Sequence, residues 1–248
     1  MQKGKIRINT ENIFPIIKKA VYSDHEIFLR ELVSNSVDAI SKRRMASFAG
    51  DCENCESPQV KITIDREKNT LTISDNGIGM NDEEIKKYIN QVAFSSAEEF
   101  LEKYKKDNDE FIGHFGLGFY SSFMVSDKVE IITKSAIGEN KAFKWSCDGS
   151  PSFTLDNTER EEIGTDVILY LLDEEKEFIE PARIKSLIKK YCDFMPIDVL
   201  LEGECINKKN PPWRKNPNEL NDEDYIELYK YLYPYQGEPL LWIHLNTD

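Results

Sequence analysis

The sequence lacks the features that mark secreted, membrane-spanning or nucleic-acid-binding proteins. Its longest apolar runs, such as residues 167–172, are far too short to cross a bilayer. Its first residues, MQKGKIRINTENIF, contain no apolar run of the signal-peptide kind. Lys and Arg number 32 against 45 Asp and Glu, and the resulting net charge of −13 disfavours non-specific binding to nucleic acid. We therefore expect a cytoplasmic protein without membrane or nucleic-acid partners.

Cysteine is also scarce. The five cysteines are an odd number and are scattered, which fits reduced thiols better than a disulfide framework. Cys52 and Cys55 form a lone CxxC, and neither a second pair nor paired histidines lie nearby. The sequence assigns no metal or redox function to this pair. The 248 residues, 40% of them hydrophobic, suffice for one large domain, or for one domain plus a fragment.

Residues 25–42 are predicted to form a helix with an unusual distribution of polar side chains. At 100° per residue, one narrow stripe contains Glu31, Asn35, Asp38 and Lys42, while most of the remaining surface is apolar. Such a row suits a polar ligand in a dry pocket, where Glu31 could act as a general base and Asn35 could offer an oxygen to Mg²⁺. The alternative is an ordinary amphipathic helix with its charges in solvent.

Two alternating segments, residues 59–65 and 70–75, are predicted to be half-buried strands. The inward side of the second strand ends in Asp75, where a hydrophobic residue is expected. A buried carboxylate is costly unless it is hydrogen-bonded. Gly77 and Gly79 follow, and glycine permits positive φ and close approach of a ligand to the backbone. A plain turn is the alternative, but the inward Asp75 favours a binding site.

A second glycine-rich stretch, FIGHFGLGFYSS, begins at residue 111. Gly113, Gly116 and Gly118 precede a helix-compatible run at 119–124, and amides at such a helix start attract phosphate. The pattern is neither a Walker A motif nor a dinucleotide-binding fingerprint. A flexible hinge is the alternative.

The rest of the chain alternates predicted strands, helices and turns. We expect strands at 1–10, 128–134, 141–147, 152–156, 164–171 and 197–201, and helices at 11–22, 81–90, within 91–106, and at 180–191. Residues 43–58 are expected to be irregular. Thr165 heads one strand and could face the same pocket as Asp75, although β-branched residues suit strands anyway.

The composition becomes polar and proline-rich at residues 205–217, which indicates a linker. A helix at 221–231 and the start of a strand at 240–245 follow. These thirty-odd residues are too few for an independent core. We therefore expect a domain at 1–204, a linker at 205–217, and the beginning of a truncated second domain at 218–248.

Several motifs, in order, resemble those of the ATPase superfamily that includes gyrase, heat-shock protein 90, histidine kinases and mismatch-repair proteins. FLRELVSNSVDAI, SDNGIGM, GHFGLGFYSSFMVSDKV and GTDVILYL are similar to the N-terminal domain of the heat-shock protein 90 family, over about residues 5–204. The tail from residue 211 resembles the opening of that family's middle domain. Because no long Lys/Glu-rich linker is present, the chain resembles the bacterial type.

This resemblance implies an α+β fold of the Bergerat type, a two-layer sandwich with helices on one face of a mostly antiparallel sheet. ATP or ADP with Mg²⁺ would lie between the helices and the glycine loop. Carried over residue by residue, Glu31 would be the general base, Asn35 would bind Mg²⁺ and Asp75 would accept from the adenine amino group. The remaining nucleotide-binding residues would be Asp38, Lys42, Gly79, Met80, Gly113, Gly116, Gly118, Phe119 and Thr165.

The resemblance further implies a chaperone in which slow ATP hydrolysis drives a homodimeric clamp acting on client proteins, with co-chaperones as further partners. An arginine from the missing middle domain would reach the γ-phosphate, so this fragment should bind nucleotide but hydrolyse it poorly. The chain departs from the family at Phe94, His114 and Tyr88, where a lysine, a glutamine and an asparagine are common. These departures affect the expected phosphate and ribose contacts.

Three other functions are compatible with the same motifs. A topoisomerase ATPase subunit should carry a basic DNA-facing domain, and nothing in this chain is basic enough. A histidine kinase needs a phosphoacceptor histidine on a dimerisation helix. The three histidines here, at positions 25, 114 and 244, lie in the helix predicted at 25–42, in the second glycine-rich stretch and in a predicted strand. A nucleotide-gated binding module would use Glu31 only structurally.

Overall fold

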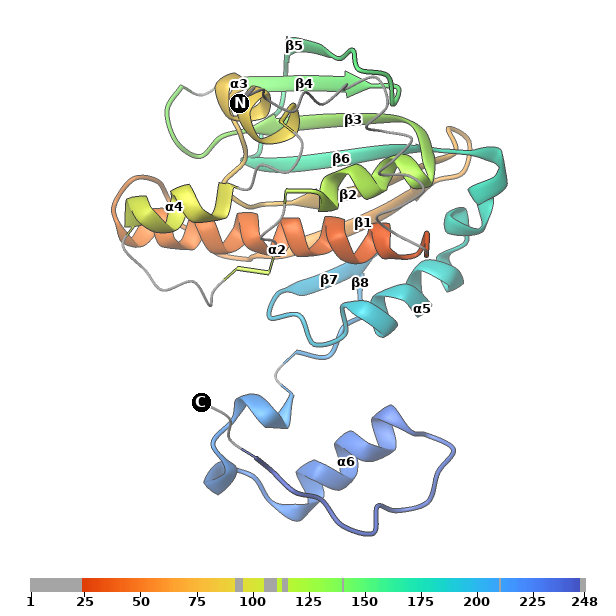
Figure 1. Ribbon diagram of the computed structural model, residues 1–248. Helices are drawn as coiled ribbons and strands as arrows, with labels where there is room; N and C mark the ends of the chain where they lie inside the picture. The colour runs from red at the N-terminus through yellow and green to blue at the C-terminus, as the bar shows by residue number, and fades with distance from the viewer. Residues whose placement is uncertain are drawn as a thin grey trace, which may run out of the picture.

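An eight-stranded sheet forms one layer of the computed structural model, and helices cover one of its faces (Figure 1). The structure describes residues 24–91, 96–104, 111–112, 116–139, 141–209 and 211–245. The strand predicted at 1–10 and the helix predicted at 11–22 lie outside these residues. The strands lie in the order β5-β4-β3-β6-β2-β1-β7-β8. All neighbouring strands are antiparallel except β1 and β7, which confirms the predicted α+β class.

The strand boundaries follow the alternation of the sequence closely. They are β1 (Gln59–Asp65), β2 (Thr70–Asp75), β3 (Ser126–Lys134), β4 (Ala142–Cys147), β5 (Thr154–Thr158), β6 (Gly164–Leu171), β7 (Asp198–Leu201) and β8 (Glu204–Cys205). The predictions for β1, β2 and β6 are confirmed to the residue. β5 begins two residues later than predicted, and β8 was not predicted. β8 is only two residues long, too short for an alternating pattern to reveal it.

Helix α2 precedes the first described strand, the other helical elements lie between strands in the chain, and they pack together on one side of the sheet. They are α2 (Ile27–Phe48), α3 (Asp82–Glu84), the π-helix η3 (Ile85–Ile89), α4 (Ser96–Tyr104), the 3₁₀ elements η5 (Gly118–Met124) and η6 (Asp173–Ile179), and α5 (Pro181–Tyr191). Asn81 begins α3 with a capping box, in which its side chain accepts from Glu84 N while Glu84 accepts from Asn81 N.

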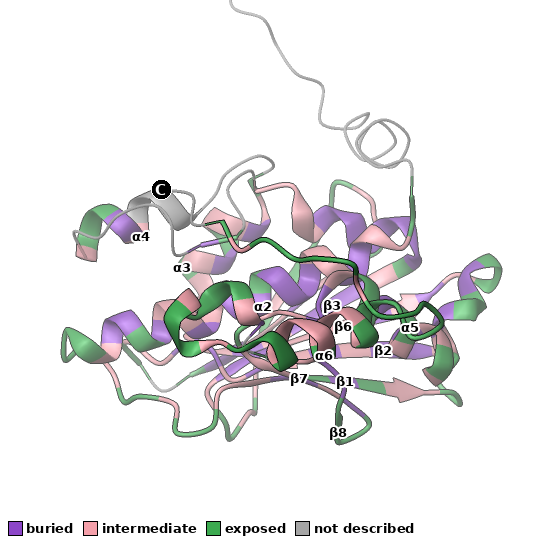
Figure 2. Ribbon diagram, turned by 90° about the horizontal axis from the view of Figure 1, so that it is seen from below, coloured by how far each residue is buried: buried purple, intermediate pink, exposed green. Residues whose placement is uncertain are grey.

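Helix α2 is the central helix of this layer and is longer than predicted. The prediction of an irregular segment from residue 43 is wrong for residues 43–48, which continue the helix. The reason is packing, because Arg43, Met45 and Ala46 are all buried. On its inner face, Phe28 and Leu29 are fully buried in a core shared with the sheet (Figure 2). The packing of this inner face on the sheet sets how far the polar row of α2 lies from the strands.

Beyond β8 the chain leaves the sheet and forms a smaller helical segment (Figure 1). It contains η7 (Pro212–Arg214), η8 (Pro217–Glu219) and α6 (Asp222–Leu232), and α6 has no buried residue. Tyr231 of α6 donates a 2.7 Å hydrogen bond to Asp193 Oδ2. The strand predicted at 240–245 is wrong, since residues 241–245 have no strand conformation and a strand requires a partner. Within the described residues no helix is both long and apolar enough to cross a membrane.

Candidate functional site

Asp75 and Thr165 form the polar centre of the inner sheet surface. They are register partners on the antiparallel strands β2 and β6, so their side chains point to the same face. Both are buried, at 7% exposure each. Asp75 Oδ1 accepts a 2.8 Å hydrogen bond from Gly77 N, and Ser36 of α2 also bonds to the Asp75 carboxylate. The structure therefore brings together the acid, the threonine and the central helix, as the sequence suggested.

The environment of Asp75 favours its neutral form. Burial raises the pKa of this carboxyl from its ordinary 3.8 to about 7. The Gly77 amide, the charge of Arg160 and the Ser36 hydroxyl act in the opposite direction, and the charge of Asp166 adds to the rise. A buried carboxyl with a strongly shifted pKa at the end of a strand is a candidate for binding a polar ligand.

The strand-end turn, residues 76–80, is clamped between α2 and β3. Ile78 N donates to Ala39 O of α2 at 3.0 Å, and Ala136 N donates to Ile78 O at 2.7 Å. A Cβ at Gly77 would lie 2.5 Å from the Ala39 carbonyl carbon, and one at Gly79 would lie 2.0 Å from Lys134 O. Both glycines are required by the protein's own packing, because its own backbone makes the close approach.

Thr133 on β3 is a site residue that the sequence did not reveal. Its fully buried hydroxyl accepts from Met80 N at 3.0 Å, lies 2.9 Å from Thr165 Oγ1 and bonds to Gly164 O at 3.1 Å. It thereby fixes Met80 and Thr165 in one network. Only the β3–β6 register, which pairs Thr133 with Thr165, places it there, and a single strand pattern carries no register.

On α2, Glu31 faces the segment that begins with Gly118. Glu31 Oε1 accepts from Arg30 at 3.1 Å from Nε and 2.5 Å from Nη2. A Cβ at Gly118 would lie 2.5 Å from Glu31 Oε2, so a larger residue here would displace the end of the Glu31 side chain. Asn35 is exposed one turn further along. Within the described part of the chain, no three His, Cys, Asp or Glu side chains are grouped to hold a metal.

Asp38 and Lys42 contact the first residues of the glycine loop, which we define as residues 111–118. Asp38 Oδ1 accepts a 2.9 Å hydrogen bond from Ile112 N. The Lys42 ammonium lies 5.7 Å from the Phe100 ring centre and 5.5 Å from that of Phe111. Burial lowers the pKa of Lys42 from 10.5 to about 8, against the attraction of the nearby Asp38 and Glu84 carboxylates. Asp38 and Lys42 of the polar row therefore meet this segment of the chain, whereas Asn35 is exposed.

The remaining predicted residues are placed unevenly. Phe119 packs edge-on against Trp145, with ring centres 5.7 Å apart, and Gly116 has a φ of +62°. Tyr88 is half-buried on the π-helix η3, and Lys87 Nζ lies 5.5 Å from its ring centre. Gly113, together with His114 and Phe94, lies outside the described residues.

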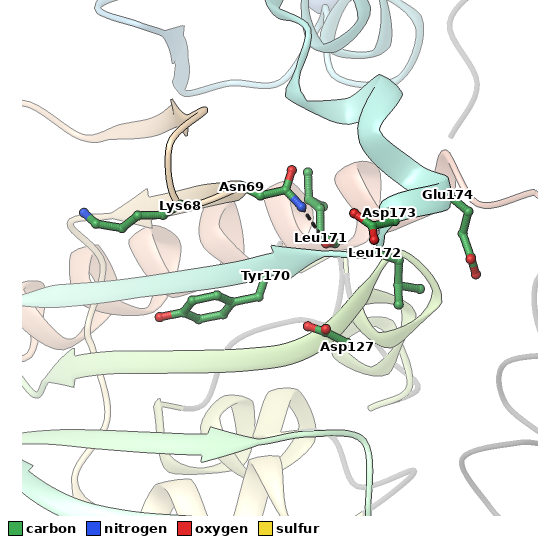
Figure 3. A pocket seen from close by; sticks show the side chains of 8 residues that line it. All are labelled: Lys68, Asn69, Asp127, Tyr170, Leu171, Leu172, Asp173 and Glu174. Atoms are coloured by element: carbon green, nitrogen blue, oxygen red, sulfur yellow. Dashed lines mark hydrogen bonds between the residues drawn. The ribbon is translucent and has the colours of Figure 1, made fainter.

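An open cavity of about 450 Å³ lies elsewhere, at the opposite ends of β2 and β6 from the Asp75–Thr165 pair (Figure 3). Eight residues line it: Lys68, Asn69, Asp127, Tyr170, Leu171, Leu172, Asp173 and Glu174. Its four charged side chains belong to exposed residues. Charged groups in water bind a ligand weakly, so we place the candidate site at Asp75 and not here.

Comparison with known proteins supplies independent information. The family model for histidine kinase-, DNA gyrase B-, and HSP90-like ATPases matches residues 22–160. The chain is 53% identical to the chaperone protein HtpG of Bacteroides thetaiotaomicron over 263 residues, which covers all of this chain and 38% of the relative. HtpG of Porphyromonas gingivalis is 48% identical with the same coverage, and that of Clostridium perfringens is 37% identical, with 44% of the relative covered. The chain thus spans less than half the length of these relatives.

Proposed function

Because this chain belongs to the histidine kinase-, DNA gyrase B- and HSP90-like ATPase family, we propose that ATP or ADP binds between α2 and the Asp75–Thr165 pair. The family predicted from the motifs is confirmed. The observation that carries the proposal is Asp75, a buried acid on a strand end with a threonine beside it on the next strand. A purine amino group is a donor of the kind that such a carboxyl accepts.

The proposal gives each polar residue of the site a role. Asp75 accepts from the adenine amino group, and Thr165 and Gly79 support the base through water. Asn35 offers its side-chain oxygen to Mg²⁺, whose other ligands are phosphate oxygens and water, as is usual for this ion. The phosphates and the pocket wall involve Asp38, Lys42, Met80, Gly113, Gly116, Gly118 and Phe119. Two of these already make contacts at α2: Asp38 accepts from Ile112 N, and Gly118 abuts Glu31.

Glu31 is proposed as the general base for hydrolysis. One of its carboxylate oxygens is held by Arg30, and the other lies next to Gly118, at the start of the helix that follows the glycine loop. Arg30 thus fixes the orientation of the carboxylate while Oε2 is directed to the loop side. A base in a fixed orientation can accept a proton from a water positioned at the reacting phosphorus.

At the level of the full protein, we propose an ATP-dependent chaperone. The support is that relatives matching the whole chain are chaperone proteins. Client proteins, a homodimer, co-chaperones and a cytoplasmic location belong to this proposal. The topoisomerase alternative predicts that duplex DNA stimulates ATP hydrolysis, and we expect DNA to have no effect.

Calorimetry with ADP and Mg²⁺ tests the binding site. Asp75→Asn should abolish detectable binding, because an amide replaces the buried acceptor and leaves the purine donor without a proper partner. The matched control is Asp127→Asn, an exposed aspartate at the far end of the same sheet region, which should bind as the wild type does. Unchanged ADP affinity in Asp75→Asn would refute the site.

A further inference from the structure

Cys52 and Cys55 lie in a loop that is bonded to the proposed nucleotide site. We define the cysteine loop as residues 51–58. Both cysteines are free and only partly buried, so small reagents can reach them. The loop has no helix or strand of its own between α2 and β1. Its conformation is therefore set by a few contacts with neighbouring elements.

Arg43 connects the cysteine loop to the strand-end turn. Its Nε donates to Glu53 O at 3.2 Å, and its Nη1 donates to Asn76 O at 2.8 Å. Glu53 lies between the two cysteines, and Asn76 follows Asp75. Cys52 Sγ is also 3.7 Å from the Arg43 carbonyl oxygen, within reach of a weak S–H hydrogen bond. Arg43 is itself buried, so these carbonyl hydrogen bonds compensate for the water that its guanidinium has lost.

A second link runs through Asn76. Its side-chain oxygen accepts from Gln59 N at 3.0 Å, and its amide donates to Ser57 O at 2.7 Å. The cysteine loop is therefore held at Glu53 and at Ser57 by groups that also hold the residue next to Asp75. A change in the backbone of this loop must strain or break one of these links.

We propose that Cys52 and Cys55 form a reversible disulfide with small-molecule disulfides as oxidant, and that this closure loosens the strand-end turn and weakens nucleotide binding. The second half of this proposal rests on the proposed function. The backbone of Glu53, which Arg43 holds, lies within the ring that the disulfide closes.

The chemistry needs no further reagent. The Cys55 thiolate attacks one sulfur of glutathione disulfide and releases one glutathione thiolate. The Cys52 thiolate then attacks the Cys55 sulfur and releases the second, so two cysteine protons are lost and one glutathione disulfide is reduced to two thiols. Burial raises the pKa of the Cys52 thiol, against the effect of the Arg43 charge, which makes Cys52 the less available first nucleophile.

The test uses the 248-residue chain in glutathione buffers of increasing oxidation. Intact mass and peptide mapping should show a loss of two hydrogens on the peptide that contains both cysteines. Hydrogen exchange should become about tenfold faster at the amides of residues 76–80, because a charged hydrogen bond is lost. The dissociation constant for ADP should rise by about the same factor. The Cys52→Ser/Cys55→Ser variant should show none of these changes, whereas Cys205→Ser, which removes an exposed cysteine on β8, should respond like the wild type.

Arg43→Met supplies the second variant. In the reduced state it should already show fast exchange and weak ADP binding, and oxidation should add nothing. A chain that forms no disulfide, or one that forms it with unchanged exchange at residues 76–80, overturns the proposal. If the reduced wild type binds no ADP, the proposed function fails, while the mass and exchange measurements still decide the thiol chemistry and its coupling.

Discussion

Asp75 is the residue on which the site depends, and its burial has a price that a structural carboxylate would avoid. The carboxyl receives hydrogen bonds from Gly77 and Ser36, yet its pKa is still raised to about 7. A purely structural aspartate is usually compensated enough to keep a low pKa. The remaining cost of ionising Asp75 would be lowered by a further hydrogen-bond donor, such as one from a bound ligand.

This penalty should appear as a pH dependence of stability in the nucleotide-free protein. The unfolded carboxyl ionises near 3.8, whereas the folded one keeps its proton to about 7, so the folded state binds more protons in that window. The stabilising contribution is complete below the unfolded pKa and declines as pH rises to about 7. The decline is at most about 4 kcal/mol, at 1.36 kcal/mol per pKa unit.

Urea unfolding of the wild type and of Asp75→Asn, at about pH 5 and pH 8, measures this contribution. The wild type should gain stability relative to the variant at the lower pH, since an asparagine does not titrate. A stability difference that is the same at both pH values would contradict the assigned shift.

Glu31→Ala distinguishes hydrolysis from simple binding. ATP hydrolysis should fall to background while affinity for ADP stays within about a factor of ten, because a general base acts mainly on the transition state. The control is Glu174→Ala, an exposed glutamate at the open cavity, which should hydrolyse ATP at the wild-type rate. Wild-type hydrolysis by Glu31→Ala would show that Glu31 is structural.

Among the secondary-structure elements, the contact of β2 with α2 and β3 decides the shape of the site. Gly77 lets the strand-end turn lie against the Ala39 backbone of α2, and Gly79 lets it lie against Lys134 of β3, where Thr133 also accepts from Met80 N. These contacts set where Asp75 stands relative to the polar row of α2. The turn is thus held rigidly before any ligand arrives, which reduces the ordering cost of binding.

Two glycines with positive φ allow the cost of backbone strain to be measured separately from the cost of a steric collision. Gly79 has φ +65°, and a Cβ there would collide with Lys134 O, whereas Gly138 has φ +88° and nothing within 4 Å. Gly138→Ala should cost only the backbone strain, about 1–2 kcal/mol. Gly79→Ala should cost about 1–3 kcal/mol more, because the turn must move.

Chemical denaturation of both variants gives the two costs, and ADP calorimetry shows whether the displaced turn still binds. We expect weakened binding only in Gly79→Ala. Equal losses of unfolding free energy in the two variants would mean that the turn moves away from the new Cβ without a free-energy penalty.

For the molecule as a whole, the sheet and its helices form a unit that ends near Ile206. Among the residues that the structure describes, the hydrophobic core cluster contains none beyond Ile206, and α6 has no buried residue. Several apolar side chains of the last described residues are largely exposed, among them Leu240, Leu241, Ile243 and Leu245. The C-terminal segment therefore adds little to the stability of the unit that contains the site.

Removal of residues 210–248 should accordingly leave the site intact. The shortened chain should keep its thermal midpoint within about 4 °C and bind ADP with unchanged affinity, since it loses only peripheral contacts such as Tyr231–Asp193. Differential scanning calorimetry and ADP titration provide the comparison with the complete 248 residues. A large drop in midpoint would show that α6 supports the first unit after all.

The sequence by itself determined most of the strands, the central helix as far as residue 42, and the polar residues at the end of β2 and along α2. Alternation gives β1 and β2 to the residue, because each strand buries one face, and the inward Asp75 stands out against that pattern. Helical spacing gives the row from Glu31 to Lys42 for the same local reason. The family motifs add the roles, which stay predictions until the variants are measured.

Tertiary structure alone decided which segments the predicted strands and helices contact. Thr133 joins the site through strand register, Arg43 joins the cysteine loop to Asn76 through a buried side chain, and α2 continues to Phe48 because its last turns are covered. Residues 241–245 form no strand despite their apolar pattern. Register, burial and pairing depend on segments far apart in the chain, and no local periodicity encodes them.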